Sequence, residues 1–323
     1  MLSNKKSNYS PKKVISLLYN YLIIRKIDWE ERIMSMNYMV LNKFDNIFND
    51  FKTEISKASS LCKLRELNFY GDSLPNYNDS TLQKFYLARY LLAYYVEYAK
   101  LYEDLIEKDF IKNGYNILSI GCGCGLDLWG LKKATENTKI NYNYTGLDCV
   151  KWDYSDFFGE KFINNRIENI YKLDSSNYNV IMFPKSIGEF DQETFENLKN
   201  TIRNSNFDEK NLVLISAHRK LREENDSERL FDIMEIFEYE HNYIFKDSST
   251  VSTKYENKQY LEYINPQIKY PWEKMKFIKH LSCFCKERLI CSGDCEESLS
   301  RYPVNSDSQF CYQIITLTKE EFF

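Results

Sequence analysis

Glycine, proline and histidine are scarce in this sequence, with 10, 6 and 3 residues among 323. So few turn-forming residues argue against a loop-rich all-β protein and favour a helical or α/β one. No apolar run approaches the ~18 residues that a membrane span needs. Basic and acidic residues nearly balance, 43 against 47. The chain therefore has no overall charge that would attract nucleic acid or an anionic membrane.

The amino-terminal segment is basic and then apolar, an order that also begins secretory signals. Tyr19 and Asn20 interrupt its apolar run, and no small-residue cleavage site follows. Val14, Leu17 and Leu18 lie on one helical stripe, so we interpret the segment as an amphipathic helix. We expect a cytoplasmic protein with no membrane partner, in which nine cysteines favour free thiols or a metal site over disulfides. The basic segment could also contact an RNA backbone, although such runs are usually solvated.

The chain divides into two stretches of different character. Residues 1–110 are predicted to be an α-helical accessory or substrate domain, with a long helix that begins at Asp79 or Ser80. In residues 111–323 the strand candidates YNILSI, NYNYTGLD, YNVIMF and NLVLISA alternate with helical segments. This alternation predicts a doubly wound, mostly parallel sheet with helices on both faces. Two further strand candidates, MKFIKHLS and QFCYQIITLT, lie near the carboxyl terminus.

A glycine-rich turn follows the first strand candidate, in the order Gly121-Cys122-Gly123-Cys124-Gly125-Leu126-Asp127. Alternate glycines let the backbone turn sharply and approach a ligand, and the next helix presents its amides there. The second strand candidate ends at Asp148, where a carboxylate can bond a ribose diol. The dinucleotide fingerprint requires a sixth-position glycine, and Leu126 stands there instead.

With this G-x-G-x-G spacing the chain resembles the class I methyltransferases, which bind S-adenosylmethionine. The resemblance implies a seven-stranded sheet with a terminal antiparallel hairpin. It covers 111–220 well and 275–318 less closely, and it leaves out the amino-terminal helices. Many family members carry an acid at the position of Ser119, and Asp127 could substitute for it near the methionine amino group. The cofactor-binding candidates are Gly121, Cys122, Gly123, Gly125, Asp127, Asp148 and Phe183.

The fourth strand candidate should end beside the transferred methyl group, because ligands bind outside the carboxyl ends of parallel strands. Methyl transfer is an in-line displacement, so the protein aligns the acceptor and removes a proton where needed. The polar candidates for these tasks are Lys185, Ser186, Glu189 and His218. Lys185 and Glu189 could instead be solvated loop ends, and His218 a surface histidine. Phe183 and a single proline depart from the Asn/Asp-Pro-Pro-aromatic motif of enzymes that methylate base amines.

Four of the nine cysteines fall close together, in the pattern C-x-C-x5-C-x3-C. Four thiolates can bind zinc tetrahedrally, although this spacing is not the usual pair of C-x-x-C motifs. The cluster predicts either a structural zinc site or reduced cysteines in a loop. Its members are Cys283, Cys285, Cys291 and Cys295.

A methyltransferase is the function that these features favour, with a small-molecule substrate favoured over RNA or protein. An aminopropyl or aminocarboxypropyl transferase of the same fold is one alternative. A non-catalytic nucleoside-binding scaffold is another. Tyr90, Tyr94 and Tyr98 of the long helix could stack on a planar substrate or simply pack in the core.

Overall fold

Two long helices precede the sheet in the computed structural model. Helix α2 spans Met36–Lys57 and helix α3 spans Ser80–Glu107. The Asp79 carboxylate caps α3 by accepting hydrogen bonds from the amides of Thr81 and Leu82. The structure describes residues 35–58, 61–64, 75–112, 114–173, 177–218, 223–245, 251–255, 272–281, 285–286 and 310–320. The helical character predicted for the stretch before residue 110 is thus present in both helices.

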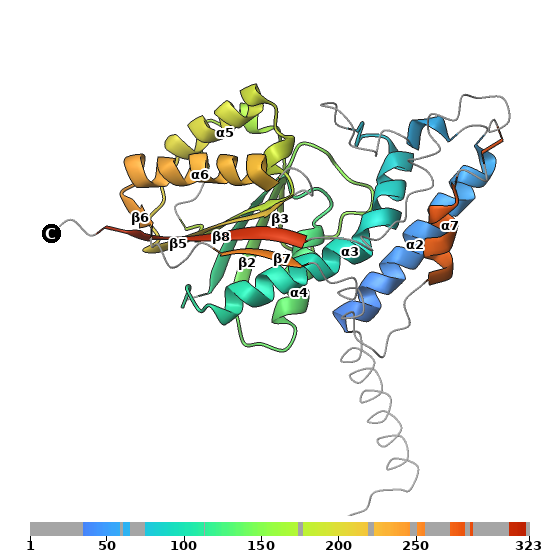
Figure 1. Ribbon diagram of the computed structural model, residues 1–323, viewed down its shortest axis with the longest axis horizontal. Helices are drawn as coiled ribbons and strands as arrows, with labels where there is room; N and C mark the ends of the chain where they lie inside the picture. The colour runs from blue at the N-terminus through green and yellow to red at the C-terminus, as the bar shows by residue number, and fades with distance from the viewer. Residues whose placement is uncertain are drawn as a thin grey trace, which may run out of the picture.

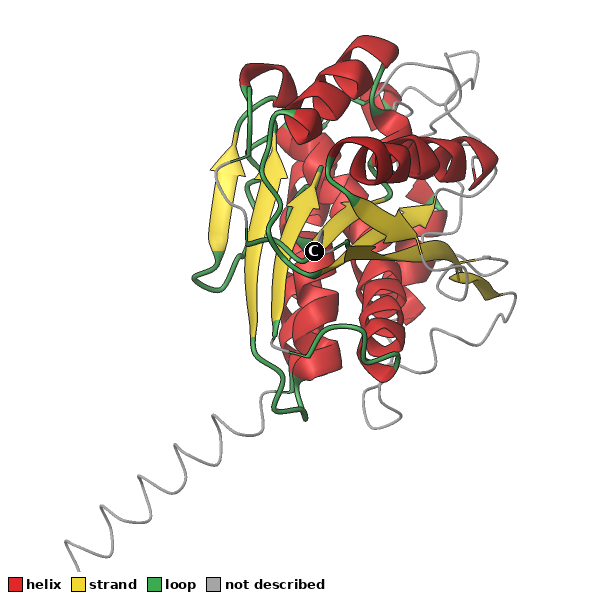
Figure 2. Ribbon diagram, turned by 90° about the vertical axis from the view of Figure 1, so that its left-hand side faces the viewer, coloured by secondary structure: helices red, strands yellow, loops and turns green. Residues whose placement is uncertain are grey.

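The sheet is mostly parallel and seven strands wide (Figure 2). Five strands pair in parallel in the order β3-β2-β1-β4-β5. Strand β8 runs antiparallel along β5, and its other edge pairs with the two short strands β6 and β7 in turn. The predicted fold class is therefore confirmed. The strands are β1 (Tyr115–Ile120), β2 (Tyr142–Asp148), β3 (Lys161–Asn164), β4 (Val180–Pro184), β5 (Asn211–His218), β6 (Tyr243–Phe245), β7 (Val251–Tyr255) and β8 (Phe310–Lys319).

The prediction of a strand at MKFIKHLS, one half of the terminal hairpin, is wrong. The segment MKFIKHLS begins within helix α7 (Trp272–Lys279), and the antiparallel partners of β8 come from β6 and β7. Met275, Ile278 and Leu281 are fully buried at a spacing of three, which suits one face of a helix. A short apolar run does not by itself distinguish a helix from a strand. Packing on the other helices decides here, as the edge-to-face contact between Phe48 of α2 and Phe277 shows.

Helices cover both faces of the sheet (Figure 1). Helices α5 (Gln192–Arg203) and α6 (Glu223–Glu240) lie on one face, and α3 and α4 (Leu126–Thr135) lie on the other. Alternate residues of each central strand enter opposite cores, as the two-residue period of a strand requires. Ile181 and Phe183 join the core beneath α5 and α6, whereas Val180 and Met182 join the core shared with α2 and α3.

Helix α3 packs closely on α4 and so holds the amino-terminal helices against the sheet. Gly130 makes this approach possible, since a Cβ there would lie 2.4 Å from the Cβ of Tyr98. The division into an accessory domain of residues 1–110 and a cofactor domain of residues 111–323 stays a proposal. None of the helices within the described ranges has both the length and the apolar character needed to cross a membrane.

Candidate cofactor and substrate site

The glycine loop turns at the carboxyl end of β1 through left-handed backbone conformations. The φ angles of Gly121, Gly123 and Gly125 are 72°, 57° and 82°, values that residues with a Cβ adopt only at a cost. The amides of Gly121 and Cys122 both donate to the carbonyl of Leu147, over 2.8 and 3.2 Å. The loop is thereby fixed to the end of β2.

Asp148, at the end of β2, is bonded directly to this loop. One of its carboxylate oxygens accepts a 2.8 Å hydrogen bond from the amide of Gly123, and the other accepts one from Val150. Burial raises the pKa of Asp148. Each carboxylate oxygen retains a second lone pair, and the side chain is only partly buried. Asp148 can therefore accept further hydrogen bonds, such as those that the hydroxyls of a ribose diol donate.

Aromatic rings enclose the glycine loop. The indole of Trp152 lies beside Gly123, where a Cβ would be 3.8 Å from the ring. Trp152 packs against Tyr77 and Tyr86, with ring centroids 5.4 and 5.2 Å apart. Phe157 covers Gly125, at 3.1 Å from the place of a Cβ. The loop after β2 and one face of α3 thus form the wall of the site.

Asp127 lies beneath the loop rather than on its open side. Its side chain is fully buried, and both carboxylate oxygens are 2.9 Å from the hydroxyl of Tyr144. Ser119, at the position of the family's acid, is also fully buried. Burial raises the pKa of Asp127 from 3.8 to about 6. The carboxylate suggested for the cofactor's amino group thus has a partner in the interior.

This raised pKa predicts a pH-dependent loss of stability. Folded Asp127 holds its proton up to about pH 6, whereas the unfolded chain releases it near its ordinary value, so stability falls as the pH rises between these values. The loss is up to about 3 kcal/mol. Replacing Asp127 with asparagine should therefore stabilise the protein more at pH 7 than at pH 4.5, measured by urea unfolding. An equal effect at both pH values would contradict the prediction.

Lys185, directly after β4, is tied to helix α3. Its backbone has a left-handed φ of 61°, and its ammonium lies 2.9 Å from the carboxylate of Glu97. It also donates to the carbonyl of His218 over 3.2 Å and lies 4.8 Å from the centre of the Tyr94 ring. Glu97 is fully buried and Lys185 nearly so. The structure thus brings two of the catalytic candidates, Lys185 and His218, together. The ammonium of Lys185 is engaged in the ion pair with Glu97.

Three other residues predicted for the site, Ser186, Phe183 and Glu189, do not take part in the ion pair of Lys185 with Glu97. Ser186 is buried and donates a 2.5 Å hydrogen bond to the carbonyl of Ile120, which joins β4 to the glycine loop. Phe183 is fully buried in the core beneath α5 and α6. Glu189 lies in the 3₁₀ turn η3 (Ile187–Glu189) and is partly exposed. Burial raises the pKa of Tyr86 strongly, and the charge of Glu189 adds to this rise, which places Glu189 on the α3 side of the site.

The predicted zinc site falls largely outside the described residues. Of its four cysteines only Cys285 is described, where it packs partly buried against the core; Cys283, Cys291 and Cys295 are outside. In the described ranges no three His, Cys, Asp or Glu side chains gather as metal ligands would. Burial raises the pKa of Cys124 to about 12, so the loop thiols are protonated and unsuited to binding metal. Zinc stays a prediction.

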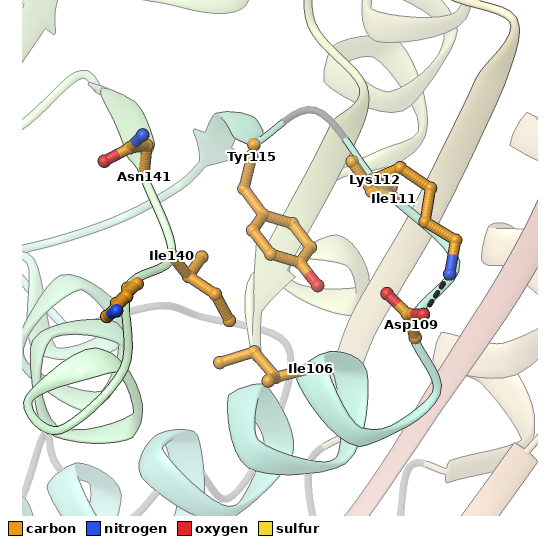
Figure 3. Close-up of a pocket in the computed structure, with 9 residues that line it drawn as sticks. Ile106, Asp109, Ile111, Lys112, Tyr115, Ile140 and Asn141 are labelled. Atoms are coloured by element: carbon orange, nitrogen blue, oxygen red, sulfur yellow. Dashed lines mark hydrogen bonds and ion pairs between the residues drawn. The ribbon is translucent and has the colours of Figure 1, made fainter.

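A surface pocket at the opposite end of the sheet is separate from this site (Figure 3). It has a volume of about 340 Å³ and lies beside Tyr115, where β1 begins. An ion pair between Asp109 and Lys112 lies at its edge. Because ligands of doubly wound sheets bind at the carboxyl ends of the strands, this pocket is not the candidate cofactor site.

The order of the strands decides the fold. From β1 the sheet continues through β2 and β3 to one side and through β4 and β5 to the other, so the glycine loop lies at the topological switch point. Strand β8 inserts antiparallel between β5 and β6. The chain therefore has a doubly wound, Rossmann-like fold with an antiparallel end, the architecture that the resemblance in the sequence predicted.

Comparison with known proteins gives distant similarities. No family model matches the chain, and no curated protein matches it. Among solved structures, the plantazolicin methyltransferase BpumL is 14% identical over 87% of this chain and 100% of its own, with a TM-score of 0.38. YjhP of Escherichia coli is 13% identical, covers 69% of this chain and 92% of its own, and has a TM-score of 0.35. The 1,6-didemethyltoxoflavin-N1-methyltransferase of Burkholderia thailandensis is 10% identical, covers 71% of this chain and 79% of its own, and has a TM-score of 0.36.

Sequence reasoning missed the residues that α3 contributes. Glu97 and Arg89 are charged yet almost fully buried. They lie within helix α3, which was predicted from its apolar residues. Charged residues among the apolar positions of this helix could have indicated a functional site, because a charge is buried only with a partner or a ligand. Trp152 carried no signal, since its contact with Gly123 depends on the path of the loop after β2.

Proposed function

We propose that the chain is a methyltransferase that uses S-adenosylmethionine and acts on a small molecule. The observation that carries this proposal is the hydrogen bond between the Gly123 amide and the Asp148 carboxylate. It joins a turn whose alternate residues lack side chains to an acid that can accept further hydrogen bonds, at the switch point of the sheet. This combination fits a nucleoside with a ribose diol.

The residues of the loop have separate tasks in this proposal. Gly121 and Gly125 supply left-handed turns in the loop, Gly123 leaves room for the ligand to lie against backbone, and Asp148 accepts the ribose hydroxyls. The bound cofactor would supply a methyl group on a sulfonium, an electrophile that needs no metal. The protein then has to align the acceptor, exclude water and take a proton if the acceptor carries one. Glu189 is our candidate for the proton acceptor, because Lys185 is engaged with Glu97.

The wall of the site favours a small, planar acceptor. Tyr86, Tyr90 and Tyr94 recur at every fourth position of α3 and are all partly exposed. Neighbouring rings have centroids 5.0 and 5.1 Å apart, so the three tyrosines form a continuous aromatic strip. Such a strip offers stacking area to an aromatic or heteroaromatic ring. The near balance of charge in the chain gives no comparable support to an RNA substrate.

Binding and product analysis test the proposal. We expect S-adenosylhomocysteine to bind the purified full chain with one-to-one stoichiometry by isothermal titration calorimetry. Incubation with S-adenosylmethionine and pooled small-molecule acceptors should release S-adenosylhomocysteine. Release of methylthioadenosine instead would favour an aminopropyl or aminocarboxypropyl transferase. Binding without any turnover would favour the scaffold, and no saturable binding to a folded sample would reject a nucleoside site.

A further inference from the structure

Arg89, in the middle of α3, is a buried cation that forms no ion pair with any of the described residues. Arg89 is 2% exposed. Its Nε and Nη1 atoms have no hydrogen-bond acceptor in the part of the chain that the structure describes. Arginine stays protonated in proteins and cannot relieve its burial by losing a proton. An isolated buried charge is costly, and natural structures therefore pair such groups or use them to bind ligands.

Three carboxylates of helices α2 and α3 form ion pairs with other cations. Glu97 lies further along α3, about 80° around the helix axis from Arg89, and it pairs with Lys185. On the neighbouring helix α2, Glu54 pairs with Lys84 of α3 and Asp45 pairs with Lys274 of α7. None of these three ion pairs includes Arg89.

The guanidinium of Arg89 lies against the aromatic strip of the site. Its central carbon is 5.3 Å from the ring centre of Phe85 and 5.2 Å from that of Tyr90. Tyr90 stacks on Tyr94, with ring planes 20° from parallel and centroids 5.1 Å apart. The ammonium of Lys185 lies over Tyr94. Arg89 and Lys185 thus lie at the two ends of a stacked tyrosine pair, and of these two cations Lys185 has a counterion.

We propose that Arg89 binds a carboxylate of a ligand held against this face of α3. The planar guanidinium matches a carboxylate through two parallel hydrogen bonds, and its two unpartnered nitrogens supply the donors. The proposal rests on the proposed function, since it places the carboxylate on the acceptor or on the methionine portion of the cofactor. An aromatic acid suits the acceptor, because its ring would meet the tyrosine strip while its carboxylate meets Arg89.

The first test compares wild type with Arg89→Met in binding. The probes are S-adenosylhomocysteine, methylthioadenosine, which lacks the amino-acid carboxylate, phenylacetate, and the neutral phenylacetamide. If the acceptor supplies the carboxylate, the substitution weakens phenylacetate binding at least tenfold in the presence of S-adenosylhomocysteine and leaves phenylacetamide unchanged. If the cofactor supplies it, binding of S-adenosylhomocysteine weakens at least tenfold and binding of methylthioadenosine does not. Failure to find either Arg89-dependent loss overturns the proposal.

The second test measures the melting temperature without ligands. Removal of an uncompensated buried charge should stabilise the empty protein, so Arg89→Met should raise the melting temperature by about 3 °C. Arg229 is the matched control, since it lies over Phe195 but donates to the carbonyls of Ile187 and Phe190. Arg229→Met should lower the melting temperature. A fall with Arg89→Met as large as that control's would show a structural role and overturn the proposal.

The two proposals can fail separately. If wild type binds no S-adenosylhomocysteine, the methyltransferase proposal fails, while the phenylacetate comparison and the melting temperatures still test Arg89. If wild type binds S-adenosylhomocysteine and Arg89→Met binds both acidic probes equally well, the proposal for Arg89 alone fails.

Discussion

Replacing Gly123 with alanine is expected to leave the protein folded and to weaken S-adenosylhomocysteine binding by at least about 100-fold. A Cβ at this position would make only ordinary contact with Trp152, at 3.8 Å, so the unliganded structure has room for it. The same Cβ would stand where a ligand must approach the backbone amide that bonds Asp148. Isothermal titration calorimetry measures the loss, and circular dichroism checks the fold.

Gly159 provides the matched control for this substitution. Its φ of 86° is also left-handed, and no atom lies within 4 Å of the place of its Cβ. Both alanine variants bear a similar backbone strain of about 1–2 kcal/mol. Gly159→Ala should therefore lose similar stability and keep its affinity for S-adenosylhomocysteine. Equal binding by the two variants would show that the glycine loop is an ordinary structural turn.

Replacing Lys185 with methionine is expected to destabilise the protein by about 3–5 kcal/mol. The side chain of Glu97 is 0% exposed, and the substitution would remove the cation that lies 2.9 Å from this buried carboxylate. The second substitution Glu97→Gln, added to Lys185→Met, should restore most of the stability, because it removes the isolated charge. Urea unfolding of the two single variants and the double variant measures this coupling.

An exposed ion pair on the same helix serves as the control. Lys100 and Glu103 form a pair in which both side chains are about two-fifths exposed, so Lys100→Met should change stability by less than about 1 kcal/mol. Equal effects of Lys100→Met and Lys185→Met would contradict the assignment.

Features encoded by neighbouring residues were predictable from the sequence. The helix around residues 80–107 follows from its unbroken apolar period and its Asp79 cap, and the alternation of strands and helices gave the sheet. The glycine loop depends on backbone freedom at Gly121, Gly123 and Gly125, which residue type alone determines. Asp148 reaches the loop because parallel strands end at the same edge of a sheet.

Features that depend on distant contacts were not predictable. Residues 275–282 combine apolar and basic residues in a short run that suits a strand or a helix, and packing beside α2 decided for a helix. Phe183 and Met182 are adjacent and both apolar, and only the pleat of β4 sends Phe183 to the face beneath α5 and α6. Asp127 was predicted to face the cofactor, but in the structure its carboxylate bonds the hydroxyl of Tyr144 of β2 inside the core.

The sequence by itself determined the class of fold, the glycine turn and the acid beside it, because these rest on residue type and on short spacings along the chain. Only the tertiary structure decided which charges meet. Glu97 and Lys185 are far apart in sequence yet share a buried ion pair, whereas Arg89 is buried beside Tyr90 with no such partner among the described residues. Burial and pairing depend on how α3 packs against α4 and one face of the sheet, and no local pattern specifies that placement.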